Sequence, residues 1–295
     1  MTPFRLDLTA EALRRLSNNV VDRICEDGAY MRILADSRGS GLVRVTQIRT
    51  DALLFEAETK AAARFAPVIQ RMLGTAVDLR PWYRNVKGVP WLDRLARALR
   101  GVKPPRYPGV WEALCHSIVF QQISIHAAGA IMARTVEALA MPRTIDGVAM
   151  YAFPSPQAVA AAPVQTLRAA GLSVNKVTAL HEVAAAVLRG AVDEAVLDAL
   201  PSEAAAARLA ELRGIGAWSA TVVLLRGLGR LDVFPLKDSG VAASLRVLGE
   251  NPDINVDELL ATLGGQRGML YFLLLLGRIA QRRTAAATPA THRGL

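Results

Sequence analysis

The sequence predicts an α+β protein, in which a small N-terminal antiparallel sheet with helices is followed by an all-helical body. Between residues 30 and 57, three short segments alternate or run apolar and are separated by polar turns, as antiparallel strands are. From Trp82 onward, apolar residues recur with helical spacing, and Pro and Gly punctuate the pattern. The 295 residues are enough for two or three structural units with their own cores.

Residues 1–81 form the predicted sheet-and-helix domain, with its boundary near Arg80 and Pro81. Helical periodicity predicts helices that pack on one face of the sheet. The predicted helices cover residues 10–24 and 62–73, and the predicted strands cover residues 30–34, 42–48 and 52–57.

Residues 82–281 form the predicted helical domain, which includes a proline-rich linker at 103–109. Residues 282–295 are rich in Ala, Thr, Pro and Arg, which predicts a disordered tail. The predicted helices cover residues 110–120, 124–139, 156–162, 164–170, 175–188, 193–200, 202–212, 217–228, 239–248, 256–263 and 269–280.

The composition favours an anionic partner, because the formal net charge is +9. Nucleic acid is the natural candidate, although each short basic group alone is also typical of a solvated surface. Cys25 and Cys115 are far apart and form no metal-ligand pattern with the four histidines, which predicts a reduced intracellular protein without metal. The N-terminus lacks the pattern of a signal peptide, and the longest apolar run, residues 269–276, is too short for a bilayer. We therefore expect no membrane association and a cytoplasmic location, nucleoid-associated in a bacterium.

A Gly-x-Gly turn lies between two of the predicted helices. Gly214 and Gly216 allow a sharp turn that brings bare backbone N–H groups, including that of Ala217, to the start of the second helix, where an anion is favoured. Ile215 between them is expected to point into the core. The turn can therefore hold one phosphate, although such a turn alone is also typical of an ordinary helix C-cap.

Asp238 follows this hairpin at the start of the next predicted helix. Its simplest role is that of an N-cap for residues 239–248. Its functional alternative is a carboxylate that the helix dipole keeps ionised and that faces a developing positive charge.

Taken together, these motifs resemble the helix-hairpin-helix and Gly/Pro-Asp signature of the DNA glycosylase superfamily, in particular its alkylation-repair branch, 3-methyladenine DNA glycosylase II. The resemblance covers most of the chain and implies an all-helical glycosylase core with its hairpin at residues 203–228. It also implies that residues 82–107 pack with the helices after residue 231. Four elements in order carry it: Leu212-x-Gly214-Ile215-Gly216-x-Trp218-Ser219-Ala220, Asp232-x-Phe234-Pro235-x-x-Asp238, Phe120-Gln121-Gln122-Ile123-Ser124 and, more weakly, Leu167-Arg168-Ala169-Ala170-Gly171-Leu172-x-x-x-Lys176.

The resemblance implies a monomeric enzyme that acts on damaged double-stranded DNA and leaves an abasic site. Asp238 matches the catalytic carboxylate. Gln122 matches the residue that enters the DNA stack when the target nucleotide is flipped out, and a polar side chain there can both fill the gap and bond the orphaned base. Its alternative is a solvated glutamine at a helix end, before the N-cap Ser124.

Alkylated purines such as 3-methyladenine and 7-methylguanine are cationic, so an aromatic base pocket is expected. Trp218 is the first candidate for that pocket, followed by Tyr271 and Trp111. A purely structural role in the core is the alternative for each of them.

Two absences define the branch. The lysine nucleophile of members that also cut the strand is replaced by Trp218, and neighbouring Lys237 is interpreted as a flexible surface residue, so no imine chemistry is expected. Two cysteines cannot bind the iron–sulfur cluster that other branches hold through four. The resemblance leaves room for a structural monovalent cation at the hairpin when DNA is bound.

Two other functions stay open. A non-catalytic helix-hairpin-helix module would keep Gly214, Ile215 and Gly216 but would need neither Asp238 nor Gln122. A glycosylase for deaminated or oxidised bases would keep all of them and differ in its pocket.

Overall fold

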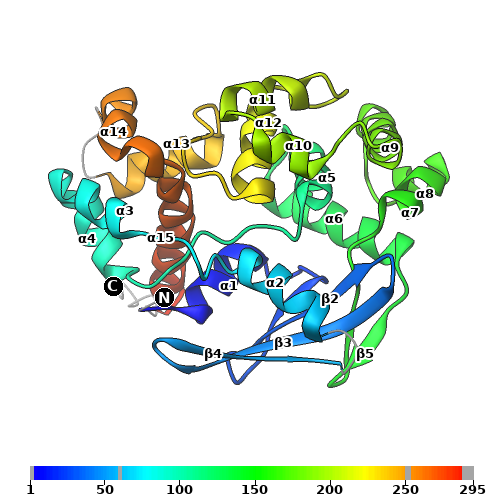
Figure 1. Cartoon of the computed structure of the whole chain (residues 1–295), viewed down its shortest axis with the longest axis horizontal. Helices are drawn as coiled ribbons and strands as arrows, with labels where there is room; N and C mark the ends of the chain where they lie inside the picture. The colour runs from blue at the N-terminus through cyan, green and yellow to red at the C-terminus, as the bar shows by residue number, and fades with distance from the viewer. Residues whose placement is uncertain (1–2, 59–61, 250–253, 288–295) are drawn as a thin grey trace, which may run out of the picture.

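The computed structural model describes residues 3–58, 62–249 and 254–287. A four-stranded sheet lies along one side of the molecule, α1 and α2 lie between it and the helical body, and the remaining helices form two groups (Figure 1). The predicted α+β architecture is confirmed.

The sheet is an antiparallel meander in the order β1-β2-β3-β4. Buried Val43 and Val45 alternate with more exposed residues along β3, as expected for a sheet that covers the core with one face. Tyr30 lies opposite Val45 and Val43 opposite Ala57. The bounds are β1 (Asp22–Ile24), β2 (Tyr30–Asp36), β3 (Gly39–Arg49) and β4 (Ala52–Ala57), with α1 (Leu6–Arg14) and α2 (Ala62–Met72) beside them.

The predicted helix over residues 10–24 is wrong in its second half. The helix α1 ends at Arg14, and Asn19 then accepts hydrogen bonds from the backbone of Val21 and Asp22, which turns the chain into β1. Asparagine competes with helical backbone bonding in this way. A local turn and pairing with β2 therefore override the helical periodicity.

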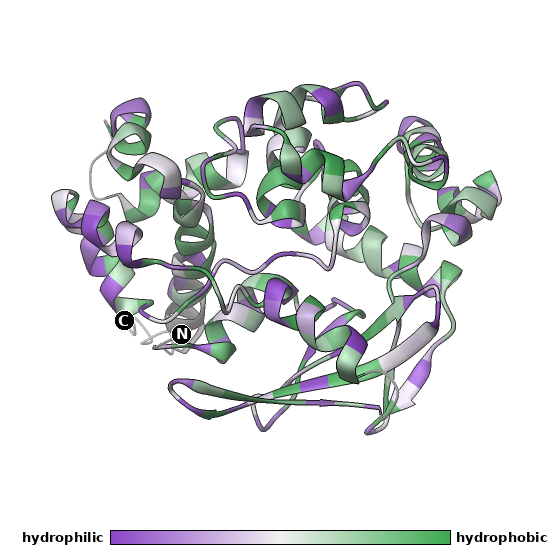
Figure 2. Cartoon of the chain, viewed as in Figure 1, coloured by the Kyte–Doolittle hydropathy of each residue, from purple (hydrophilic) through white to green (hydrophobic). Residues whose placement is uncertain are grey.

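The first helical group contains the predicted hairpin and shares one hydrophobic core with the sheet. Hydrophobic residues gather on α5 and α12, at the centre of the molecule (Figure 2). The group consists of α5 (Val110–Val119), α6 (Ile125–Leu139), α7 (Pro156–Ala161), α8 (Val164–Ala169), α9 (Val174–Leu188), α10 (Glu194–Ala199), α11 (Ser202–Ala210), α12 (Ala217–Val223) and a π-helical turn, η2 (Leu224–Leu228).

The second group joins segments that are far apart in the chain. Trp82 and Leu92 pack in one core with Leu260 and Phe272, as expected for this segment and the C-terminal helices, whereas Tyr107 at the end of the expected range belongs to the first core. No single described helix is long and apolar enough to cross a membrane, although α14 and the start of α15, bent by 110°, satisfy the criteria of length and composition as a pair. The elements are α3 (Arg80–Asn85), η1 (Val86–Gly88), α4 (Pro90–Ala98), α13 (Ser239–Leu248), α14 (Val256–Leu263), η3 (Gly264–Gln266) and α15 (Gly268–Ala287).

Two features depart from the sequence predictions. Residues 143–150 form a hairpin of β5 (Arg143–Ile145) and β6 (Val148–Met150), whose turn residues Asp146 and Gly147 both have positive φ. Helix α15 continues to Ala287, where a disordered tail was predicted from residue 282, and residues 288–295 lie outside the described residues.

Buried arginines link the N-terminal elements to the helical body. Arg32 of β2 forms ion pairs with Asp22 and with Glu112 of α5. Arg226, in the π-helical turn, donates to the carbonyl of Ala12 in α1 at 3.1 Å. These contacts fix α1 relative to the hairpin, and hence position the residues at its C-terminal end.

Candidate active site

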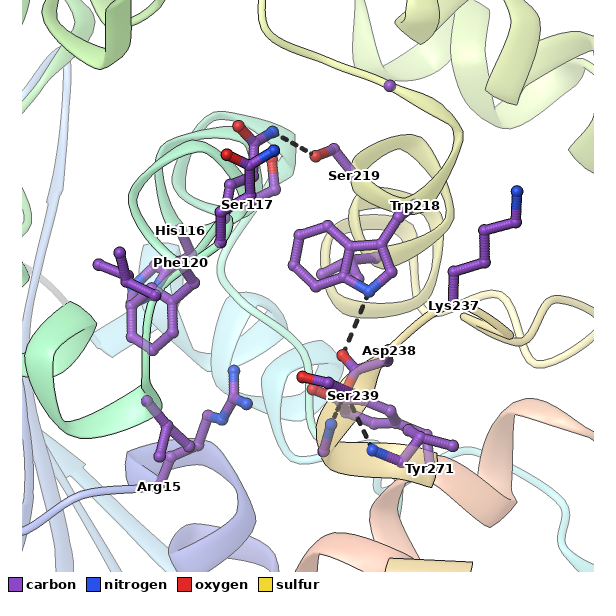
Figure 3. A pocket seen from close by; sticks show the side chains of 18 of the residues that line it. Arg15, His116, Ser117, Phe120, Trp218, Ser219, Lys237, Asp238, Ser239 and Tyr271 are labelled. Atoms are coloured by element: carbon purple, nitrogen blue, oxygen red, sulfur yellow. Dashed lines mark hydrogen bonds between the residues drawn. The ribbon is translucent and has the colours of Figure 1, made fainter. Parts of the chain in front are cut away.

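A cavity of about 1360 Å³ opens between the two helical groups. The hairpin and the α5–α6 loop form one side, and the start of α13 and one face of α15 form the other. The C-terminal end of α1 contributes to its floor (Figure 3). Segments separated by more than 200 residues therefore meet at one site.

Asp238 lies at this cavity as the N-cap of α13. Its Oδ1 accepts backbone hydrogen bonds from Gly240 at 2.8 Å and Val241 at 3.0 Å, as the sequence suggests. Its Oδ2 accepts a hydrogen bond from Nε1 of Trp218 at 3.2 Å (Figure 3). The carboxylate is therefore held by three donors and lies at the positive end of the α13 dipole.

Trp218 has two functions in this arrangement. Its ring lines the cavity, and its indole N–H donates to the carboxylate of Asp238 across the site. The indole N–H is a donor only, so the carboxylate oxygen is the acceptor in this contact and its orientation is fixed. This positioning role was missed, because the sequence does not show that residues 218 and 238 are in contact.

The hairpin has the predicted geometry. Gly214 has φ +80, and a Cβ there would lie 2.7 Å from the Cβ of Ala179, so glycine is required. Ile215 is only 4% exposed and belongs to the core, as expected. Gly216 is the N-cap of α12, no side chain caps that helix, and no atom lies within 4 Å of a Cβ placed on Gly216. The backbone from Gly216 to Ala217 is therefore open to an approaching anion.

The α5–α6 loop presents Gln122 at the edge of the cavity. Gln122 is exposed and has φ +57, which is uncommon for a residue with a side chain. Its neighbour Gln121 donates to the carbonyl of Gly214 at 2.6 Å and to Ser219 at 2.7 Å. Lys176, from the weaker fourth motif, donates to the carbonyl of Gln121 at 2.8 Å. The loop is thus anchored to the hairpin while Gln122 projects freely.

The structure brings Tyr271 to the cavity but not Trp111. Tyr271 lies on α15 close to Asp238 and lines the same cavity as Trp218 (Figure 3). Trp111 instead donates its indole N–H to the carbonyl of Pro154 at 2.8 Å and packs against the core. Its assignment to the base pocket is wrong, because it faces a different side of α5 from the residues that line the cavity.

On α5, His116 and Phe120 line the cavity, and Tyr107 stacks on His116 with ring centroids 4.4 Å apart. Burial, reinforced by nearby positive charges, lowers the pKa of His116 well below its usual value, so this imidazole is neutral. The guanidinium of Arg15 also points into the cavity (Figure 3). The sequence analysis assigns these residues no role in the site. Arg15, Tyr107 and His116 precede the recognisable motifs, Phe120 only begins one of them, and tertiary packing brings all four to the cavity.

Lys237 is exposed, and its side chain extends away from the carboxylate of its neighbour Asp238 (Figure 3). This orientation agrees with its interpretation as a surface residue. Within the described ranges, no group of three or more His, Cys, Asp or Glu side chains is arranged to hold a metal ion.

An uncapped glycine hairpin and a preorganised carboxylate on one cavity define a class of protein that binds a phosphate backbone and performs chemistry beside it. Comparison with known proteins agrees with this assignment. Residues 115–264 match the family described as HhH-GPD superfamily base excision DNA repair protein. The chain therefore belongs to the HhH-GPD superfamily, whose members are helix-hairpin-helix DNA glycosylases of base excision repair.

Three relatives show the range of similarity. The chain is 25% identical to DNA-3-methyladenine glycosylase of Bacillus subtilis over 81% of its own length and 78% of that protein. It is 33% identical to DNA-3-methyladenine glycosylase 2 of Escherichia coli over 48% of its length and 50% of that protein. The structure of 3-methyladenine DNA glycosylase from Archaeoglobus fulgidus superposes with a TM-score of 0.78 at 24% identity, covering 94% of this chain and 96% of the other.

The fold is also shared with enzymes of another specificity. The 8-oxoguanine glycosylase/lyase of Clostridium acetobutylicum, solved with double-stranded DNA, gives a TM-score of 0.76 at 15% identity, covering 96% of this chain and 94% of that one. The fold alone therefore does not select the lesion.

Proposed function

We propose that this protein is a monofunctional DNA glycosylase that flips alkylated purines of the 3-methyladenine and 7-methylguanine type out of double-stranded DNA and hydrolyses their N-glycosidic bond. The observation that carries this proposal is Asp238, a carboxylate held by Gly240, Val241 and Trp218 on an aromatic-lined cavity beside a phosphate-binding hairpin. The names of the relatives from B. subtilis and E. coli support the choice of alkylated bases.

The proposed mechanism needs few groups. A cationic purine is already a good leaving group, so the main requirement is stabilisation of the positive charge that develops on the sugar as the bond breaks. Asp238 supplies a fixed negative charge for this purpose, and its carboxylate can also orient and deprotonate the attacking water. Because its hydrogen bonds are formed before substrate arrives, little reorganisation is needed in the transition state.

The aromatic side chains Trp218 and Tyr271 support binding of the cationic base. An aromatic face attracts a cation by about 0.5–2 kcal/mol beyond ordinary contact. Both side chains line the cavity that holds Asp238. Attraction between these rings and the cationic base can therefore contribute to selection of alkylated over normal bases, and it acts against repulsion from the guanidinium of Arg15 in the same cavity.

The absence of strand cleavage is part of the proposal. A lyase needs an amine close to the sugar, and the position that carries this amine in the bifunctional members is occupied by Trp218. Lys237, the next candidate in sequence, points away from Asp238 (Figure 3). Water is then the nucleophile, and the product is an intact strand with an abasic site.

DNA binding follows from the two turns that border the cavity. In this proposal the open backbone at Gly216 and Ala217 donates to one phosphate, and the exposed side chain of Gln122 at the edge of the cavity fills the gap left by the flipped nucleotide. We further propose that the protein acts as a monomer and that a monovalent cation binds the hairpin in the DNA complex. We also propose that it holds no iron–sulfur cluster, since the chain has only two cysteines, Cys25 and Cys115.

The alternatives differ in what they require. A non-catalytic DNA-binding module has no use for a carboxylate held by three donors on a cavity. A glycosylase for oxidised or deaminated bases would use the same fold, and the cationic Arg15 in the cavity favours bases with hydrogen-bond acceptors.

The test is incubation of the purified protein with methylated double-stranded DNA, with released bases identified by mass spectrometry. We expect 3-methyladenine or 7-methylguanine in solution and an abasic strand that breaks only after alkali or heat. Borohydride should trap no covalent protein–DNA adduct. Release of oxidised or deaminated bases alone would contradict the proposed substrate class, and an adduct that is lost in Lys237→Ala would contradict the monofunctional mechanism.

A further inference from the structure

Arg15 enters the proposed base cavity from outside the glycosylase core. It is the C-cap residue of α1, with φ +62 and ψ −45, and its backbone N–H donates to the carbonyl of Glu11. From this turn its side chain extends toward the space between Phe120 and Asp238 (Figure 3). Because Arg226 bonds to Ala12 of the same helix, α1 is held in place against the hairpin group.

The guanidinium of Arg15 has N–H donors that are available to a ligand. Within the described part of the chain it forms no ion pair with a carboxylate, and its Nε is buried without a hydrogen-bond partner. Burial opposes its charge, but the nearby Tyr271, Tyr107 and Asp238 more than offset this effect, so the pKa of Arg15 is raised and the group stays cationic. Adjacent Arg14 differs, because it pairs with Glu11 at 3.0 Å.

The guanidinium of Arg15 lies over an aromatic ring. Its central carbon lies 5.4 Å from the ring centroid of Phe120, on the wall of the cavity opposite Trp218 (Figure 3). A flat base that enters between these walls would meet a planar group whose N–H bonds are directed outward. Guanidinium groups have five donors and no acceptor.

This chemistry discriminates between purines at their 6-position. A 6-oxo purine such as 7-methylguanine or hypoxanthine presents a carbonyl oxygen, which accepts from arginine as guanine does in DNA recognition. A 6-amino purine such as 3-methyladenine presents an N–H donor there, which leaves both donors unpaired. A buried site that is built to form a hydrogen bond rejects an analogue that cannot form it.

We propose that Arg15 is a specificity-determining residue, whose guanidinium donates to the 6-oxygen of the flipped purine and so favours 6-oxo over 6-amino lesions. This inference rests on the proposed glycosylase function. It makes α1, a part of the N-terminal region, a direct contributor to lesion choice.

The experiment uses the full chain and DNA methylated to contain both 7-methylguanine and 3-methyladenine, so that the two released bases are measured in one reaction. In Arg15→Met, we expect single-turnover release of 7-methylguanine to fall at least tenfold, while release of 3-methyladenine is kept or rises because the unpaired donors are removed. Arg14→Met, which removes the neighbouring charge outside the main cavity, should leave the ratio unchanged. Thermal melting establishes that each variant is folded.

Arg15→Lys keeps the charge but loses the planar group, and we expect it to give an intermediate ratio; it also serves if the methionine variant fails to fold. Equal loss of both bases, or no change in their ratio, would overturn the role of Arg15 while leaving the proposed function intact. If the wild-type protein releases neither base, the proposed function itself is overturned.

Discussion

The hairpin and the turn that carries Asp238 border the same cavity, but their polar atoms are satisfied in different ways. At the hairpin, Gly216 begins α12 without a capping side chain, and the space next to its Cα is open. At the start of α13, the carboxylate of Asp238 accepts from two backbone amides and from Trp218. One helix start is left uncapped and the other is fully capped.

This difference suits the two helix starts to different functions, one to phosphate binding and the other to catalysis. Unpaired amides at a helix start lose stabilisation in the free protein and recover it when a phosphate binds, so the uncapped start is suited to ligand binding. A capped carboxylate is already oriented and contributes its charge without rearrangement, so the capped start is suited to catalysis. Each turn can therefore be changed separately, and the consequences should differ in kind.

The largest effect is expected for Asp238→Asn. Asparagine is also a good N-cap, so α13 and the thermal stability should be retained, while the negative charge is lost. We expect single-turnover base excision to fall by about 10²–10³-fold, as for the loss of other preorganised electrostatic groups. Binding to an abasic-site analogue should stay within about threefold of wild type.

The matched control is Asp232→Asn, which removes an exposed carboxylate on the incoming loop and should leave excision unchanged. An excision rate for Asp238→Asn within tenfold of wild type would show that this carboxylate is only a helix cap.

The second effect is expected at the hairpin, for Gly216→Asp. The backbone there has φ −91 and nothing lies within 4 Å of an added Cβ, so aspartate fits and can cap α12 itself. Thermal stability should be kept or raised, whereas DNA affinity should fall about tenfold at fixed salt, equally for all sequences, because the new carboxylate takes the place of the phosphate.

Gly265→Asp is the matched control, since Gly265 is exposed, has equally open surroundings and lies outside the residues that line the cavity. If DNA affinity measured by titration is unchanged in Gly216→Asp, the hairpin has a structural role only.

Most of the fold follows from local sequence signals. Strand alternation placed β2, β3 and β4, and periodicity with Pro and Gly punctuation placed most helices of the body. The failures are informative. The hairpin at residues 143–150 carries an Asp-Gly turn, Asp146-Gly147, and so had a usable signal that was overlooked. The error at residues 10–24 had a different cause, because pairing of β1 with β2 is a long-range effect.

The residues of the candidate site also fall into those that local sequence signals predict and those that only long-range packing brings to the cavity. The hairpin glycines, Gln122 and Asp238 lie in contiguous motifs, so their spacing in the sequence preserved their relationship in space. Arg15, by contrast, reaches the cavity through packing of α1 against distant elements, and the sequence near it has no recognisable motif. Trp111 was chosen by residue type alone, which gave no information on the face of α5 that it occupies.

A smaller effect is expected for Trp218→Phe, which tests the hydrogen bond between Trp218, just after the hairpin, and Asp238 at the start of α13. Phenylalanine keeps an aromatic ring in the cavity but removes the indole N–H that donates to Asp238 at 3.2 Å. A hydrogen bond of about 1 kcal/mol corresponds to an excision rate roughly fivefold lower. Trp218→Leu, which also removes the aromatic face, should lower the rate further for cationic bases.

The measurement is single-turnover excision together with affinity for an abasic-site analogue. Loss of affinity without loss of rate in Trp218→Phe would show that the indole supports binding and does not position the carboxylate.

The smallest effect is expected for Gln122→Ala, in the α5–α6 loop. The side chain of Gln122 is proposed to fill the gap in the DNA stack while the target base is flipped out. Extruding a base costs most in a well-paired duplex and least at a mismatch. We therefore expect about threefold slower excision of a paired lesion and no change for the same lesion opposite a mismatched base. Gln122→Leu, which keeps the volume of the side chain, should stay close to wild type on both substrates.

Gln122→Gly separates the side chain from the backbone at this position. Its φ of +57 suits glycine, so this variant relieves local strain while it lacks the wedge. If the wedge matters, the glycine variant should behave like Gln122→Ala, slow on the paired lesion and unchanged on the mismatch. Excision that is equally fast on both substrates in all three variants would show that the exposed side chain of Gln122 does not enter the DNA, and that the anchored loop beside it serves only to support the hairpin.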